Sequence, residues 1–229
     1  MARLILVYGQ PAAGKSYALK TLNPDATVII DGDRKGALPW RGWKKLYNSE
    51  RKNFFAASSL DKTIKLIEII ANADDYKHVK NIIVDGLNNI MSIEDTAAYF
   101  GKRPQYKNKF DIYEAISQKT IWLIEIAKGY RADLNIIFNA HVKTADPYAT
   151  GEVDRLFTPG KALENKKKIE GAFNYVFYAK SDVEGNHVFE TAPINSTARS
   201  PEGCFPPTIP NDMQFIIDTI DKYDEGEDS

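Results

Sequence analysis

Short apolar runs alternate with longer segments of helical periodicity along most of the chain. The runs with the length of a strand are Arg3–Tyr8, Thr27–Ile30, Asn81–Val84 and Leu134–Phe138. Segments in which apolar residues recur every three or four positions are Leu60–Ala73, Asn88–Phe100 and Phe110–Tyr130. Strands that alternate with helices predict an α/β fold, in which a mostly parallel central sheet is flanked by helices.

The C-terminal third of the chain has a different pattern. Two β-rich runs, Phe173–Ala179 and His187–Thr191, are joined by a turn over Asp182–Asn186. We therefore expect an antiparallel C-terminal extension of the sheet. The segment from Ile209 to Asp212 then caps a closing helix that ends near Tyr223.

Composition places the chain among ordinary globular proteins, with 43% hydrophobic and 27% charged residues. No apolar stretch approaches the roughly 20 residues of a membrane helix, so we expect no membrane association. The single cysteine, Cys204, excludes an internal disulfide and favours a cytoplasmic location. We predict one domain over residues 1–223 and a disordered acidic tail over 224–229.

The most specific motif follows the first apolar run. Residues 9–16 match the phosphate-binding pattern G-x-x-x-x-G-K-S between a strand and a helix. Backbone N–H groups of such a loop, and the start of the helix, point at phosphate oxygens. Lys15 should reach the β- and γ-phosphates of ATP, and the Ser16 hydroxyl should ligate Mg²⁺. The predicted nucleotide-binding residues are Gly9, Gln10, Pro11, Ala12, Ala13, Gly14, Lys15, Ser16 and Tyr17.

Candidate catalytic groups end the next strands. Asp33, in preference to Asp31, is the candidate general base that orients the attacking water, although a turn with local Asx hydrogen bonds is an alternative for both. Asp85 closes an apolar run in the form of a Walker B strand, and it would hold Mg²⁺ through water and Ser16.

Two later residues are candidates for roles in the reaction. His141 follows an apolar run, where a polar residue can sense the γ-phosphate; a purely structural histidine is the alternative. Arg199 follows the last strand and could complete a neighbouring subunit's site as an arginine finger; an ordinary surface arginine is the alternative.

Charge is segregated although the net charge is only −1. Basic residues cluster around residues 34–52, 102–109 and 161–168; such segregation is what a local anionic partner would need, and solvated faces of an ordinary surface are the alternative for each cluster. The first cluster is interleaved with aromatic residues, namely Trp40, Trp43, Tyr47, Phe54 and Phe55. They could stack on nucleic-acid bases or pack an irregular loop onto the core. Two other segments lack clear patterns: Val142–Pro159 is expected to be a long mobile loop, and Gly160–Lys168 to begin a short helix.

The order of these motifs over about residues 3–220 resembles that of RecA-like P-loop ATPases. Among them the chain looks most like the phage-encoded nucleotide-binding proteins of single-strand annealing and recombination. By this resemblance Asp33 falls at the family's catalytic Glu, His141 near its γ-phosphate sensor, and 142–159 on a DNA-binding loop. An Asp is shorter than a Glu, which implies slow or differently assisted hydrolysis. Thr197 stands where some relatives carry Lys, which weakens the finger assignment of Arg199.

The hypothesis that follows is a Mg²⁺-dependent ATPase, stimulated by DNA, that binds single-stranded DNA in phage recombination, annealing or replication. It would form a homo-oligomeric ring or filament, meet a single-strand-binding or replication protein, and act in the cytoplasm of the host cell. Two alternatives are a nucleotide-gated loader or packaging accessory with little turnover, and a P-loop small-molecule kinase. The kinase is disfavoured because the long loop contains only Arg155 where an Arg-rich lid is expected.

Overall fold

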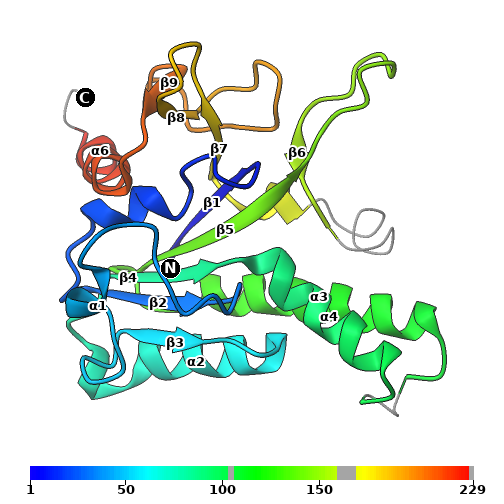
Figure 1. Ribbon diagram of the computed structural model, residues 1–229. Coiled ribbons are helices and arrows are strands. Elements are labelled where there is room, and N and C mark those ends of the chain that lie inside the picture. Colours follow the sequence, from blue (N-terminus) through cyan, green and yellow to red (C-terminus); the bar gives the residue numbers. More distant parts are fainter. Residues whose placement is uncertain (103–105, 159–168, 227–229) are drawn as a thin grey trace.

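The computed structural model describes residues 1–102, 106–158 and 169–226 (Figure 1). In this part of the chain a nine-stranded sheet has the order β3-β2-β4-β5-β1-β7-β8-β9, and β6 pairs with β5. The strands are β1 (Arg3–Gly9), β2 (Thr27–Asp31), β3 (Phe54–Ala56), β4 (Asn81–Asp85), β5 (Asn135–Lys143), β6 (Arg155–Leu156), β7 (Tyr175–Ser181), β8 (His187–Glu190) and β9 (Thr208–Pro210). The predicted α/β class is confirmed: the sheet is mostly parallel, and its C-terminal strands are antiparallel.

The register of the parallel strands determines which residues lie opposite one another at the end of the sheet. β5 lies between β1 and β4, so that Gly9 is opposite His141 and Asp85 is opposite Asn139. The apolar runs of these strands are buried, as parallel strands covered on both faces require. The carboxyl ends of β1, β4 and β5 therefore meet at one edge of the sheet.

Helices cover both faces of the sheet. Leu4 and Leu6 face one side, against α2 (Leu60–Asn72), α3 (Leu87–Tyr99) and α4 (Lys109–Lys128). Ile5 and Val7 alternate to the other side, against the 3₁₀ helix η1 (Tyr17–Thr21) and α6 (Met213–Glu225). In Figure 1 the α3–α4 pair extends away from the sheet, while α6 and η1 lie together on the opposite side. The short helices are α1 (Trp43–Leu46), η2 (Asp74–Tyr76) and η3 (Ile169–Ala172).

Two expectations about irregular segments are corrected by the structure. The loop expected over 142–159 is partly a two-stranded extension, because β5 continues to Lys143 and pairs antiparallel with β6. Asp154 anchors the base of this extension: its carboxylate accepts hydrogen bonds from Ala145 N (2.9 Å) and from the Tyr178 hydroxyl (2.7 Å). The helix expected after residue 16 is only the five-residue η1, so an α-helix dipole contributes little there.

The aromatic residues of segment 36–55 belong to the core. Trp40 and Tyr47 are buried, and Trp43 packs against Phe54 with ring centroids 5.4 Å apart. Phe54 is the first residue of β3, an edge strand that the polar sequence around it does not predict. The packing interpretation therefore holds for these rings, and burial keeps Trp40 and Tyr47 from stacking on a nucleic-acid base.

The C-terminal helix is fixed to the first strand. α6 begins at its predicted cap, where Asp212 accepts a hydrogen bond from Phe215 N (2.9 Å). It continues to Glu225, beyond the expected end at Tyr223, and Arg3 pairs with Asp221 (2.8 Å) and Asp224 (2.7 Å). Residues 227–229 of the acidic tail and the helix expected at 160–168 lie outside the described residues.

The core cluster that α6 completes also contains the chain's only cysteine. Cys204 is buried, and this burial raises the pKa of its thiol to about 11. Among the helices that the structure describes, none combines the length and apolar character needed to cross a membrane.

Candidate functional site

A cleft of about 970 Å³ opens at the carboxyl ends of β1, β2, β4 and β5. Its lining includes residues from the ends of these strands and from the loops after β1 and β2: Lys15, Ser16, Asp33, Asp85, Asn139 and His141. Ligands of open α/β sheets bind at this edge, because loops from several strands converge there. The predicted residues Lys15, Ser16, Asp33, Asp85 and His141 thus meet in one place.

The loop after β1 adopts a tight turn at the floor of the cleft. Gly14 has φ +89°, a conformation that L side chains rarely adopt, and Ala12 is also left-handed at φ +63°. The Lys15 ammonium donates to Gly9 O (2.8 Å) and Gln10 O (2.7 Å). Burial lowers the pKa of Lys15 to about 8, although Asp85 and Asp33 oppose the shift.

The other predicted loop residues divide between lining and support. Pro11, Ala12 and Tyr17 line the cleft, whereas Ala13 is buried in the core below it. The Gln10 side chain donates to Thr144 Oγ1 (3.2 Å) and so connects the loop to the end of β5.

Ser16 and Asp85 form the centre of the cleft. The Ser16 hydroxyl donates to Asp85 Oδ1 (3.0 Å), and Asn139 Nδ2 donates to the same oxygen (2.9 Å). Desolvation raises the pKa of Asp85, and the negative charges of Asp33 and Asp31 act in the same direction. A cation bound beside Asp85 would relieve this unfavourable environment of the carboxylate.

The two carboxylates at the end of β2 have different roles. Asp31 is buried and accepts a hydrogen bond from Gly36 N (2.8 Å), so it stabilises the turn that follows the strand. Asp33 lines the cleft, and its Oδ2 pairs with Lys35 (2.6 Å). Gly86, at φ +93°, leaves room for Asp33, since a Cβ there would lie only 2.2 Å from Asp33 Oδ1.

A hydrogen bond to Asn88 in α3 fixes the backbone of His141 beside the cleft. Its N–H donates to Asn88 Oδ1, and Asn88 Nδ2 donates to Phe157 O. Burial and the charge of Lys15 lower the pKa of the His141 ring, which favours neutral imidazole. Among the described residues, His141 Nδ1 and Asn139 Oδ1 are buried without a hydrogen-bond partner.

These unpartnered atoms fit a polar ligand, because buried polar atoms are nearly always hydrogen-bonded. No group of three or more His, Cys, Asp or Glu in the described part of the chain could hold a metal ion by itself. Ser16 and Asp85 could hold Mg²⁺ only together with ligand oxygens, which is the usual arrangement for a magnesium–nucleotide complex.

Arg199 does not reach the cleft of its own chain. Its guanidinium donates to Phe173 O (2.7 Å) and to Glu170 O, beside η3 and β7. The finger role therefore remains a prediction about a neighbouring subunit.

Sequence reasoning missed Lys35, Asn88, His187 and Asn211. His187 lines the cleft from β8 and Asn211 from the residue before the cap of α6, and these segments meet the P-loop only in the folded chain. The sequence pattern predicts Asn88 only as the first residue of a helix. The acid–base pattern Asp33-x-Lys35 is the one local signal that was available.

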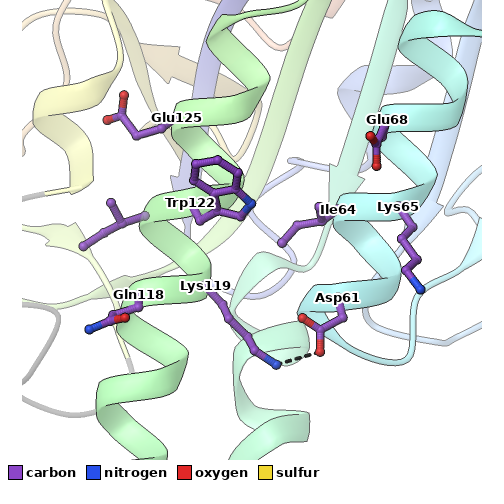
Figure 2. Close-up of a pocket in the computed structure, with 9 residues that line it drawn as sticks. Asp61, Ile64, Lys65, Glu68, Gln118, Lys119, Trp122 and Glu125 are labelled. Carbon is purple, nitrogen blue, oxygen red and sulfur yellow. Dashed lines mark hydrogen bonds and ion pairs between the residues drawn. The ribbon is translucent and has the colours of Figure 1, made fainter.

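A second hollow, of about 880 Å³, lies between α2 and α4 (Figure 2). Its described lining combines the ion pair Asp61–Lys119 (2.6 Å) with Ile64 and the exposed ring of Trp122. The phosphate-binding loop contributes no residue to this lining.

Fold and cleft together define a P-loop nucleotide-binding domain: a parallel sheet, a phosphate loop with Lys15 and Ser16, and a carboxylate on a neighbouring strand. The family model described as "AAA domain" matches residues 1–199, so the chain belongs to this family of P-loop ATPases. A comparison with curated proteins found no match.

Proposed function

We propose that the protein binds ATP with Mg²⁺ in this cleft and hydrolyses it. The observation that carries the proposal is the contact between Ser16 and Asp85 (3.0 Å), formed beside Lys15 in the cleft. In this arrangement the Lys15 ammonium leaves its two carbonyl partners for the β- and γ-phosphates. Ser16 and Asp85 would hold Mg²⁺ together with phosphate oxygens, and the ion would supply charge neutralisation at the phosphates.

Asp33 is the proposed general base. Water attacks the γ-phosphorus, the bond to the β–γ bridging oxygen breaks, ADP leaves, and the water proton passes to the Asp33 carboxylate. Asp33 must first separate from Lys35, whose ammonium is then free to approach the γ-phosphate. His141 and Asn139 line the same cleft, and their unpartnered Nδ1 and Oδ1 atoms are available to the phosphate and the attacking water.

We also propose that the protein binds single-stranded DNA, in the manner of the RecA-like proteins that its motif order resembles. The α3–α4 pair supports this proposal, since Tyr99, Phe100 and Phe110 at its end are 77%, 69% and 70% exposed. Lys107 and Lys109 are exposed beside them. Aromatic faces stack on unpaired bases, and lysines contact the phosphates.

The first test measures ATP hydrolysis with and without single-stranded DNA, beside Lys15→Ala. We expect DNA to stimulate hydrolysis in the wild type, and Lys15→Ala to abolish hydrolysis. Hydrolysis that persists in Lys15→Ala would refute the assignment of the cleft. The DNA proposal would be refuted if DNA did not change the rate of ATP hydrolysis and ATP did not change the affinity for DNA.

A salt series tests the DNA surface directly. Replacing Lys107 and Lys109 by Gln should reduce the slope of log affinity against log salt by about 1.4, because each phosphate contact with single strands contributes about 0.7. Lys62→Gln, at an exposed position on α2, is the control and should leave the slope unchanged. An unchanged slope in the double variant would exclude this surface.

One observation favours a second candidate function, a nucleotide-gated module with little turnover. Asp33 is paired with Lys35, and a base held in this way would not accept a proton until the pair separates. Tight ATP binding without phosphate release, together with a captured protein partner, would support that function.

A further inference from the structure

The cleft continues past the phosphate loop onto a neutral surface. A Cβ at Gly14 would lie 2.8 Å from His187 Cγ and 2.9 Å from Asn211 Nδ2, so both side chains pack directly on this glycine. They come from β8 and from the residue before the cap of α6, whereas Lys15 comes from the loop after β1 and Asp85 is the last residue of β4.

Asn211 is unusual because its whole amide lacks partners. In the described part of the chain, neither its Oδ1 nor its Nδ2 makes a hydrogen bond, and both atoms are buried. An amide carries two donors and an acceptor, so leaving all of them unmade in a folded protein is costly. Asn211 also lines the cleft, so a rotation of its amide toward a ligand beside Gly14 would give both atoms the missing partners.

The chemistry of this surface fits a purine base better than a phosphate. Neither Asn211 nor the exposed imidazole of His187 is a fixed cation, and the imidazole is planar. Adenine presents an amino donor next to a ring-nitrogen acceptor, and an Asn side chain pairs with such an edge through both of its polar atoms. The 6-amino group donates to Oδ1, while Nδ2 donates to N7 or N1.

We propose that Asn211 reads the purine edge of the nucleotide and makes the cleft selective for adenine. This inference rests on the proposed function, because it requires that the phosphates bind at Lys15. His187 provides the flat surface on which the base packs. Asn211 is thus a specificity residue, separate from the groups that hold the phosphates.

The test compares the affinities of three probes: ATP, the purine ribonucleoside triphosphate that lacks only the 6-amino group, and inorganic triphosphate. Wild type should prefer ATP over the purine analogue by about tenfold, the worth of a good paired edge. Asn211→Ala should bind these two nucleotides equally, and its affinity for inorganic triphosphate should match the wild type. Asn211→Asp, which offers only acceptors, should weaken ATP and shift preference toward GTP, whose N1–H and 2-amino group are donors.

Asn72→Ala is the matched control, because Asn72 lies on α2, away from the cleft, with its amide already bonded to Glu68 O (2.8 Å). It should keep the wild-type ratio of affinities. An Asn211→Ala protein that still prefers ATP tenfold over the purine analogue would overturn the proposal, as would a wild type that does not distinguish them. A wild type that binds neither ATP nor triphosphate would instead overturn the proposed function, and this inference with it.

Discussion

Replacing Gly86 by Ala should separate nucleotide binding from hydrolysis. The new Cβ would lie 2.2 Å from Asp33 Oδ1 and 2.8 Å from Asp33 N, whereas ordinary contacts begin at 3.4 Å. The Asp33 carboxylate must therefore move by about 1.2 Å, and its backbone by about half as much. A displacement of about 1 Å in a reacting group can cost about 100-fold in rate.

The substitution also strains the backbone, since Gly86 has φ +93°. A left-handed residue with a Cβ costs about 1–2 kcal/mol, which should appear as a loss of stability. Gly203→Ala is the matched control: Gly203 has φ +77°, and a Cβ there would meet nothing within 4 Å. It should show the same kind of strain without a change in the position of Asp33.

The assay is phosphate release under saturating ATP, with urea unfolding and the affinity for a non-hydrolysable ATP analogue measured in parallel. Gly86→Ala should lose about 100-fold in hydrolysis, bind the analogue within a few-fold of wild type, and remain folded. If it hydrolyses ATP as fast as Gly203→Ala, the position of Asp33 does not matter and its role as base is wrong.

Three further predictions concern stability. Asn88→Ala should cost about 2 kcal/mol or more in urea unfolding, because it leaves His141 N and Phe157 O without their partner; a loss below that of the α2 surface variant Asn72→Ala would contradict this. The lowered pKa of His141 means that the unfolded chain binds its proton more tightly, so stability should fall as pH drops through 6.5 toward the folded value. The fall should be smaller in His141→Gln, and identical pH profiles would refute it. Arg3→Gln should cost at most about 1 kcal/mol, because its acidic partners Asp221 and Asp224 are half exposed; a larger loss in thermal unfolding would mean that the pairs hold α6 in place.

The sequence predicted the residues at the centre of the site but not those at its edge. Lys15, Asp33, Asp85 and His141 each follow an apolar run, and parallel strands bring the ends of such runs to one edge. Local pattern therefore sufficed to predict that they meet. It could not predict the different partners of the two carboxylates: Asp31 accepts a hydrogen bond from Gly36 N, whereas Asp33 pairs with Lys35, although both line the cleft.

The missed features depend on contacts between distant segments. Asn211 reaches Gly14 only because α6 docks against η1 on one face of the sheet. The edge strand β3 is three residues long and lies in a basic, aromatic segment, so its pairing with β2 gave no periodic signal. The strand β6 is shorter still, and its two residues are specified by the partner strand rather than by their own sequence.

The burial of Cys204 makes the chain a convenient reporter of its own opening. With its one thiol enclosed and its pKa raised to about 11, the native protein should react slowly with alkylating reagents at neutral pH. Each modification then requires that the cluster under α6 opens, so the labelling rate measures the free energy of that local opening. Because Asn211 precedes this helix, nucleotide that engages its amide should slow the labelling of a cysteine it never touches.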